Sequence, residues 1–396
     1  MTSSIPAHVP QDLVRDFDFV DMRGETDVYE HFRKLHDGPD FFYTPHHGGH
    51  WVATRYADME AILTNPAAFS SRHQTVPPMP ITLTLIEWDG QMHADARAVL
   101  APYFSPKAVG GLEDTARALT TSLIDGFIDK GECEFVQEFA FKMPITIMMR
   151  LMDLPPGDTP HLLQISEDIV RSVDPAVQMA AFQRVAEYVA NQVIPARRAN
   201  PGTDLFSAIL GAKIDNGRSF SDAEIISFGS VLFAAGLDTV SSTLGFIAKF
   251  LAENPAHRAR LVADPELIGG ALEEFQRRFS LANIARVVAE DIEFKGVRLA
   301  KDDCILIPTS AAGIDDQRFE NPMAIDFARK DKKTLLFGRG PHMCAGNYLA
   351  RTELRVFLQE WLRRIPDFAI KPGETPVVAP GKANCVRYLP LIWPTP

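Results

Sequence analysis

The sequence predicts a mainly α-helical protein with small β-sheets, and two observations carry this prediction. Residues 107–220 show mostly helical periodicity, broken at Pro155-Pro156 and near Asn200-Pro201-Gly202. Residues 286–308 instead alternate as a pair of strands around the turn dipeptide Lys295-Gly296. We therefore expect a single domain over residues 1–396, with β-rich parts near 40–85, 285–310 and 370–396, and helical parts at 90–280 and 345–365.

Charge and composition exclude several functional classes. A formal net charge of −11 argues against a nucleic-acid binder, which would need a basic face. No run of 18 apolar residues occurs, and the N-terminus lacks a basic segment followed by an apolar one, so neither a membrane span nor a signal peptide is expected. The four cysteines are scattered without a Cys-x-x-Cys pair, which disfavours zinc, an iron–sulfur cluster or disulfides and favours a cytoplasmic location.

The first elements are a helix at 28–35 and a strand followed by a helix within 51–69. His46, His47 and His50 cluster with two glycines just before the strand. A metal site is conceivable there, but no carboxylate or cysteine stands nearby in the sequence to complete it. We expect a turn at a strand edge instead.

The segment 72–88 is proline-rich and apolar, so it cannot form a regular helix. Long loops of this kind are often functional, and we expect this one to form a wall of a substrate pocket. The following residues, 89–106, are predicted to be helical until Phe104-Ser105-Pro106. His93 and Arg97 lie four residues apart on one face of this helix. Such a pair is either a solvated face or a cationic fork for a carboxylate.

A long helix is predicted to open at the capping box Ser221-x-x-Glu224 and to run through Glu253. Its middle, SVLFAAGLDTVSSTLGF, is apolar almost all round and is therefore expected to be buried. Asp238 and Thr239 place a carboxylate and a hydroxyl in this interior, where an unpaired charge is costly. Either the aspartate forms a salt bridge and the threonine bonds back to its own helix, or the pair has a function.

The stretch LLFGRGPHMCAG, residues 335–346, places Cys344 in a glycine-punctuated loop just before an amphipathic helix at 347–364. Its glycines allow a tight turn and close approach to a flat partner, and Phe337 can shield the sulfur from water. The start of a helix favours an anion, which suits the thiolate form in which cysteine binds metal. The alternative is a buried structural cysteine after a glycine-rich turn.

The full spacing Phe-x-x-Gly-x-x-x-Cys-x-Gly resembles the cysteine-ligand loop of the cytochrome P450 family, the haem-thiolate monooxygenases. The order of motifs from Trp51 to the end of the chain follows the family, so the resemblance covers nearly the whole chain. It implies the P450 fold, a triangular prism with haem b held between the long central helix and the cysteine loop. It also implies that Cys344 is the iron ligand.

The resemblance assigns further roles to individual residues. Asp238 and Thr239 would handle protons during oxygen activation, with Gly236 and the threonine hydroxyl loosening the helix into a bulge for dioxygen. Glu274, Arg277 and Arg329 would form a structural network that serves folding and haem loading. The haem contacts implied are His93, Arg97, Arg286, Phe337, Gly338, His342, Cys344 and Gly346.

The runs EEFQRRFSLANIARV and EWLRRIPDFAIKPG resemble the bacterial camphor-hydroxylase branch. This branch oxidises small terpenoids with electrons from a two-iron ferredoxin and an NAD(P)H-dependent flavin reductase. The loop 72–88 lacks the tyrosine that orients camphor, and Ile284 replaces an aspartate, so camphor itself is not expected. We expect a compact apolar substrate held by shape. The expected pocket residues are Ile81, Leu83, Val231, Ala234, Ala235, Ala282 and Ala383.

For partners, we expect the substrate, O2 and the ferredoxin, which a local basic patch of Arg97, Lys107 and Arg339 would attract to a monomeric protein. Two alternatives stay open: a peroxide-driven haem-thiolate enzyme and a non-catalytic haem sensor. The Asp238-Thr239 pair argues against both, because neither would require this proton-handling pair.

Overall fold

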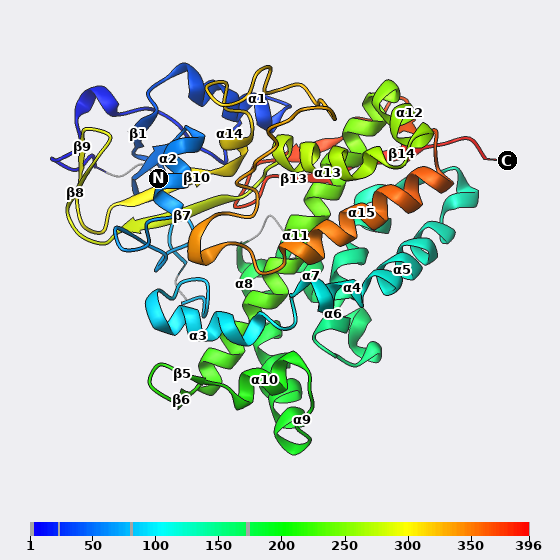
Figure 1. Ribbon diagram of the computed structural model, residues 1–396, viewed down its shortest axis with the longest axis horizontal. Helices are drawn as coiled ribbons and strands as arrows, with labels where there is room; N and C mark the ends of the chain where they lie inside the picture. The colour runs from blue at the N-terminus through cyan, green and yellow to red at the C-terminus, as the bar shows by residue number, and fades with distance from the viewer. Residues whose placement is uncertain (1–3, 23, 80–81, 172–174, 396) are drawn as a thin grey trace. The chain divides into compact units, whose positions relative to one another are not determined.

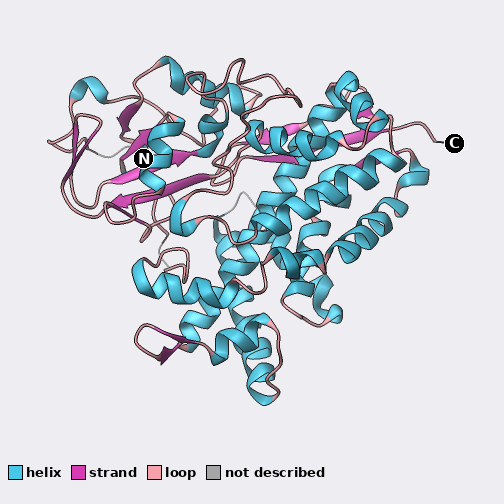
Figure 2. Cartoon of the chain, viewed as in Figure 1, coloured by secondary structure: helices cyan, strands magenta, loops and turns pink. Residues whose placement is uncertain are grey.

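The computed structural model describes residues 4–22, 24–79, 82–171 and 175–395. The chain divides into two compact units. Unit 1 comprises Met1–Ile81, Glu266–Cys344 and Val377–Val386, and unit 2 comprises Thr82–Pro265, Ala345–Pro376 and Arg387–Pro396. Both units contain helices and strands (Figure 2).

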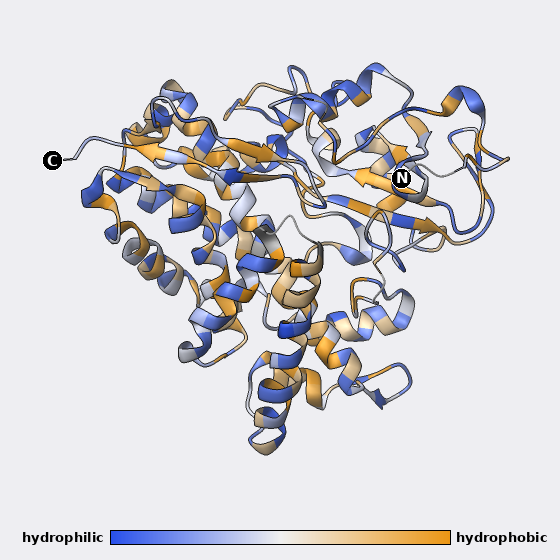
Figure 3. Cartoon of the chain, turned by 180° about the vertical axis from the view of Figure 1, so that it is seen from behind, coloured by the Kyte–Doolittle hydropathy of each residue, from blue (hydrophilic) through white to orange (hydrophobic). Residues whose placement is uncertain are grey.

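Unit 1 is built on a five-stranded sheet with the order β1-β2-β10-β7-β3 (Figure 1). The pair β2–β10 is parallel and the other neighbours are antiparallel. The strands of the chain contain both hydrophobic and hydrophilic residues (Figure 3), and β1 and β2 are buried at every position, as expected of strands covered on both faces. The strands are β1 (Phe41–Thr44), β2 (His50–Ala53), β3 (Phe69–Ser70), β7 (Asn283–Val288) and β10 (Cys304–Pro308).

The predicted strand pair around Lys295-Gly296 is confirmed. β8 (Ile292–Phe294) and β9 (Val297–Leu299) form an antiparallel hairpin, and the two turn residues have φ of 57° and 75°. Positive φ at both positions gives the turn a twist that matches the strands. A further strand pair is β12 (Val377–Ala379) with β13 (Cys385–Tyr388). The helices of unit 1 are α1 (Val28–Arg33), α2 (Tyr56–Leu63), α13 (Leu267–Arg278) and α14 (Thr309–Gly313).

Unit 2 is mainly helical. The helices other than α11 and α15 are α3 (Gly90–Leu100), α4 (Pro106–Gly110), α5 (Glu113–Asp125), α6 (Lys142–Leu151), α7 (Thr159–Arg171), α8 (Pro175–Tyr188), α9 (Ile194–Ala199), α10 (Leu205–Gly211) and α12 (Pro255–Ala263). The strands are β4 (Glu132–Glu134), β11 (Ala369–Ile370) and β14 (Pro390–Ile392) in one sheet, and β5 (Lys213–Ile214) with β6 (Arg218–Ser219). The helix predicted within residues 89–106 therefore ends earlier than expected, and Pro106 begins α4, where its missing N–H costs nothing.

Two helices of unit 2 have the predicted ends. α11 (Asp222–Glu253) opens on the predicted capping box, in which Ser221 and Glu224 satisfy each other's backbone N–H groups. α15 (Asn347–Arg364) packs against α5, and its Phe357 and Trp361 join an aromatic core with Phe135 and Phe139. Ring centroids in this core lie 5.0 Å apart for Phe135–Trp361 and 5.5 Å apart for Phe139–Phe357.

Within the described part of the chain, α11 is the one helix long and apolar enough to cross a membrane. Of its most apolar window, 71% is buried by the protein itself, which is the pattern of a core helix.

Candidate active site

The cysteine loop belongs to unit 1 as far as Cys344 and is closed by its own backbone. The N–H of Cys344 donates to the carbonyl of Phe337 over 2.8 Å, and the N–H of Gly338 donates to Leu335 over 2.8 Å. Gly338 and Gly340 have φ of 67° and 69°, which favours glycine. A Cβ on Gly340 would also lie 2.4 Å from the carbonyl oxygen of Leu63, so glycine is required there by packing as well.

Gly346 differs from the other two glycines of the loop. It is the N-cap residue of α15 with an ordinary φ of −80°, so its backbone does not require glycine. Its carbonyl accepts the N–H of Ala350 over 2.9 Å, which starts the helical ladder.

The cysteines differ in their accessibility. Burial raises the pKa of Cys304 to about 12 and that of Cys133 further, so both remain thiols at neutral pH. Cys344 is exposed at the end of the glycine loop. An exposed sulfur on a closed, glycine-shaped loop can approach a flat partner, and thiolate is a soft ligand suited to iron. These residues therefore fit a thiolate-bound haem.

Other predicted site residues of unit 1 lie on strand β7 and nearby turns. Arg286 is buried, and its NH1 group donates to Gln74 Oε1 over 3.1 Å and to the carbonyl of Ala285 over 2.8 Å. His342 and Phe337 are half-buried in the cysteine loop. Ala282 and Ala383, far apart in the sequence, form a β-bridge, so two predicted pocket residues lie side by side.

Glu274, Arg277 and Arg329 lie together in unit 1. Arg277 forms two hydrogen bonds to the Glu274 carboxylate, at 2.9 and 2.7 Å, and Arg329 Nε donates to the same carboxylate over 3.0 Å. The side chains of Glu274 and Arg277 are 0% exposed. Arg277 also donates to the carbonyls of Pro322 and Ala324, so its charge is hydrogen-bonded on several sides.

In unit 2, the middle of α11 carries the predicted Asp238-Thr239 pair. The helix is unbroken from Asp222 to Glu253, so the predicted bulge is absent. Thr239 Oγ1 donates to the carbonyl of Ala235 over 3.2 Å, and Ser242 Oγ donates to Asp238 Oδ1 over 3.1 Å. These bonds follow the helical i to i−4 spacing, so they add to the backbone ladder without breaking it.

Most of the apolar window of α11 is buried, as expected, but Asp238 and Thr239 do not lie in its buried part. Ala235 and Thr239, one turn apart, are exposed, and Ala234 and Asp238 beside them are half-buried. These four small or polar side chains form an accessible strip in the middle of a helix whose apolar window is mostly buried. A ligand of unit 2 could contact this strip.

Packing explains why residue 236 is a glycine, which the sequence alone did not show. A Cβ at this position would lie 2.7 Å from Cε of Met148 on α6 and 3.5 Å from its Cγ. The glycine thus admits the methionine side chain against the helix, next to the Asp238-Thr239 pair.

The remaining predicted residues of unit 2 lie before α3, along α3 and on α11. His93 is buried and Arg97 is half-buried, at the i and i+4 positions of this helix. Leu83 is half-buried and Val231 on α11 is buried. Ile81 lies outside the described residues.

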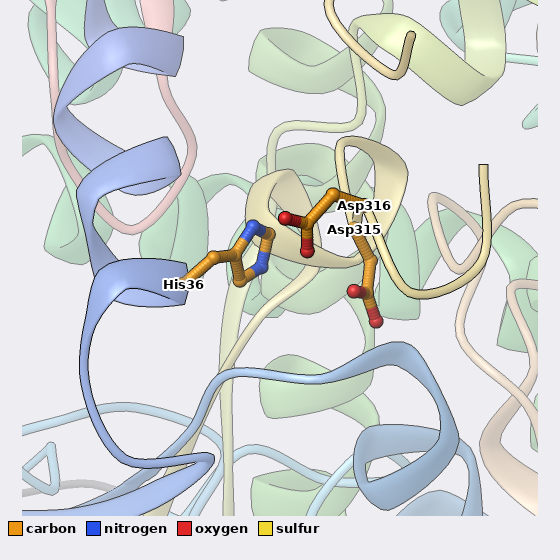
Figure 4. Close-up of side chains that lie close together, drawn as sticks. All are labelled: His36, Asp315 and Asp316. Atoms are coloured by element: carbon orange, nitrogen blue, oxygen red, sulfur yellow. The ribbon is translucent and has the colours of Figure 1, made fainter. Parts of the chain in front are cut away.

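A different cluster of metal-ligating groups lies in unit 1, where His36, Asp315 and Asp316 converge (Figure 4). Arg55 NH1 donates to both carboxylates, over 3.0 Å to Asp315 and 2.6 Å to Asp316. Burial lowers the pKa of His36, whose Nε2 donates to the carbonyl of Thr54 over 3.0 Å, so the ring is neutral. The guanidinium already provides the positive charge between these carboxylates, and we assign the cluster to Arg55 rather than to a metal ion.

Comparison with known proteins identifies the family. The cytochrome P450 family model matches residues 134–269 and 262–380. A probable cytochrome P450 127A1 of Sinorhizobium fredii is 34% identical and covers 99% of this chain and 97% of its own length. The steroid C26-monooxygenase of Mycolicibacterium smegmatis is 31% identical and covers 81% of this chain and 81% of its own length. The crystal structure of CYP101J2 matches with a TM-score of 0.91 at 35% identity, over 99% of this chain and 100% of that one.

The chain belongs to the cytochrome P450 family. It has the P450 fold, binds haem b and is a P450 monooxygenase, as the resemblance implied.

Proposed function

We propose that this monooxygenase hydroxylates a small hydrophobic, terpenoid-like molecule, using O2 and two electrons from a two-iron ferredoxin and its NAD(P)H-dependent flavin reductase. The overall reaction inserts one oxygen atom into a C–H bond and reduces the other to water with two protons. The observation that carries the choice of substrate is the accessible strip of α11, where Ala234 and Ala235 offer only methyl groups beside Asp238 and Thr239. Such a surface favours a compact apolar molecule held by shape.

We assign Cys344 as the iron ligand, and Arg286, His342, His93 and Arg97 as the propionate contacts. Haem, when bound, supplies the redox chemistry that activates dioxygen. The protein's part is to hold a thiolate on the closed loop and to neutralise two carboxylates with cationic or N–H groups. Phe337, Gly338 and Gly346 complete the cysteine side.

Proton delivery is assigned to Asp238 and Thr239. Because the hydroxyl hydrogen of Thr239 is held by the carbonyl of Ala235, its oxygen lone pairs are free to accept a hydrogen bond from a ligand. Ser242 restrains the Asp238 carboxylate, which can then pass protons from a defined position. The peroxide-driven alternative would not need this pair, nor would a haem sensor.

The basic side chains of Arg97, Lys107 and Arg339 would attract the acidic electron donor. Arg339 is partly engaged, with its Nε 3.4 Å from Glu60 Oε1, and it remains half-exposed. Surface charges of this kind steer an acidic partner more than they hold it. We expect Arg339→Glu to slow ferredoxin-dependent turnover and to weaken its salt dependence, with the reduced carbon monoxide spectrum unchanged. Unchanged turnover at low salt would exclude this attraction. We also propose that the enzyme is cytoplasmic and monomeric.

The substrate proposal is tested by the shift of the haem Soret band on titration with two panels. One panel holds monoterpenes and the other holds steroids, because relatives at similar identity are named for steroid C26 oxidation. We expect shifts with the monoterpenes and none with the steroids. Shifts with steroids alone would reject the terpenoid class. Turnover driven only by peroxide would reject the ferredoxin.

A further inference from the structure

The segment Thr82–Trp88, which precedes α3 in unit 2, holds an unusual backbone conformation. Leu85 has φ of 77° although it is neither glycine nor asparagine, and its side chain is buried. A bulky residue in this region is strained and persists only where its surroundings fix it. Two backbone bonds, from Glu87 to Leu83 and from Trp88 to Leu85, close the segment on itself.

Ser227, on the second turn of α11, holds this segment from outside. Its Oγ accepts the N–H of Thr84 over 2.9 Å and donates to the carbonyl of Thr82 over 2.9 Å. One hydroxyl thus satisfies two backbone groups at the start of the segment. The N–H of Leu83, between them, donates to Glu87 Oε2 over 2.8 Å.

Aromatic packing supplies a second attachment. Trp88 stacks on Phe220 with ring centroids 5.9 Å apart, and Phe220 stacks on Phe228 of α11 at 5.8 Å. This contact fixes the end of the segment but does not reach Thr82 or Thr84. The two hydrogen bonds of Ser227 to Thr82 and Thr84, which we call the latch, therefore hold the start of the segment.

The position of Ser227 on α11 ties the latch to the proposed substrate region. Val231, Ala234 and Asp238 follow it at i+4, i+7 and i+11, so all four residues lie along one face of the helix. The latch consequently places the segment against the same helical face that carries the accessible strip.

We infer that Ser227 is a positioning residue for specificity. Its hydroxyl keeps the strained Thr82–Trp88 segment in one conformation and so fixes the wall that Leu83 contributes to the substrate pocket. This inference rests on the proposed function only in taking Leu83 as a pocket residue. Without the latch, Leu85 would relax to negative φ, and the wall would move. An apolar pocket discriminates by shape, so a mobile wall lowers discrimination while leaving the haem ligand and the proton pair intact.

The test compares Ser227→Ala with two other variants of the holoenzyme. Ser227→Thr keeps the hydroxyl and should restore the latch. Ser230→Ala is the matched control, because among the described residues the hydrogen bond of Ser230 Oγ stays within its own helix, to the carbonyl of Ile226 over 2.9 Å. A normal reduced carbon monoxide spectrum in each variant shows that the fold and the cysteine ligation are retained.

The first readout is amide hydrogen exchange over residues 82–88 without substrate. We expect Ser227→Ala to speed exchange in this peptide by about tenfold or more, with both other variants near wild type. The second readout uses 4-phenylimidazole and imidazole, which bind haem iron whatever the natural substrate is. We expect Ser227→Ala to raise the dissociation constant of 4-phenylimidazole by about threefold to thirtyfold and to leave that of imidazole unchanged, because only the phenyl ring reaches the wall.

Unchanged exchange in Ser227→Ala would disprove the latch. Faster exchange with an unchanged ratio of the two dissociation constants would show that the segment does not border the pocket, which also overturns the inference. Failure of every monoterpene to shift the Soret band rejects the proposed substrate class alone, because neither readout uses a monoterpene.

Discussion

Glu353 of α15 is expected to destabilise the protein at neutral pH. Its side chain is 1% exposed, and within the described part of the chain its Oε1 has no hydrogen-bond partner. Burial raises the pKa of this carboxyl to about 8 from an ordinary value of 4.5. The folded protein thus keeps a proton that the unfolded chain releases.

The sign and size of the effect follow from this difference in proton binding. Between pH 4.5 and pH 8 the folded state binds more protons than the unfolded state, so stability falls as pH rises. Each pH unit in this window costs about 1.4 kcal/mol, which accumulates to about 4 kcal/mol at pH 7.5. Below pH 4.5 both states are protonated and the cost vanishes.

Glu353→Gln removes the ionisable group with little change of volume. We expect the variant to gain about 2–4 kcal/mol of unfolding free energy at pH 7.5. The gain should shrink by about 2.5 kcal/mol on going to pH 5.5. Denaturant unfolding of the holoenzyme at both pH values, followed by fluorescence and Soret absorbance, measures this. Glu273→Gln, at an exposed position, is the control for loss of a charge. Equal pH dependence in wild type and Glu353→Gln would refute the reasoning.

Three further predictions concern the sites described above. Glu274→Gln should lower the unfolding free energy by about 3–5 kcal/mol, because it leaves the buried charge of Arg277 without its carboxylate; denaturant unfolding tests this, and a loss below about 1 kcal/mol, typical of an exposed pair, would contradict it. Thr239→Ala should consume NAD(P)H while releasing more hydrogen peroxide and less hydroxylated product, and full retention of coupling would remove this residue from proton delivery. Gly340→Ala should disrupt the cysteine loop, since φ is 69° and the added Cβ would meet a backbone carbonyl oxygen at 2.4 Å. Its reduced carbon monoxide spectrum should show loss of the thiolate-ligated form, and an unchanged spectrum and thermal midpoint would show that the loop tolerates the methyl group.

Local signals allowed much of the fold to be predicted from the sequence. The capping box at Ser221 fixed the start of α11, and the turn at Lys295-Gly296 located the β8–β9 hairpin. Both are decided by residues within one turn of each other, where backbone geometry and side-chain bonding act directly. The cysteine loop was recognisable for the same reason, because its glycines and Cys344 stand within ten residues of one another.

Contacts between distant segments could not be predicted in this way. No neighbour in the sequence completes the cluster of His46 and His47, yet Asp16 and Asp18 contact them at 2.7 and 2.6 Å. The carboxylates come from the N-terminal arm, and the expected turn at the strand edge is present as a 3₁₀ turn between β1 and β2. The packing of Met148 against Gly236 of α11 could not be predicted from the sequence either. Nothing in the sequence of α6 indicates which helix its apolar residues contact.

The sequence also could not predict that α11 lacks the expected bulge. A threonine that bonds back to the i−4 carbonyl is compatible with both a loosened and an intact helix, and the sequence does not decide between them. Here Thr239 bonds to Ala235 and Thr243 bonds to Thr239, over 3.2 and 2.8 Å, along a continuous ladder.

Two buried glutamates show why burial alone does not determine the energetic role of a charge. Glu274 is fully buried and accepts hydrogen bonds from Arg277, Arg329 and the backbone N–H of Asp326. Replacing Glu274 leaves the buried charge of Arg277 without its carboxylate, so a loss of stability is expected. Glu353 is also buried, but burial is the cause of its raised pKa, and among the described residues no counter-charge offsets it. Replacing it should therefore stabilise the protein at neutral pH. The same substitution, glutamate to glutamine, thus has opposite predicted signs at the two sites, and this contrast tests the electrostatic argument more strictly than either variant alone.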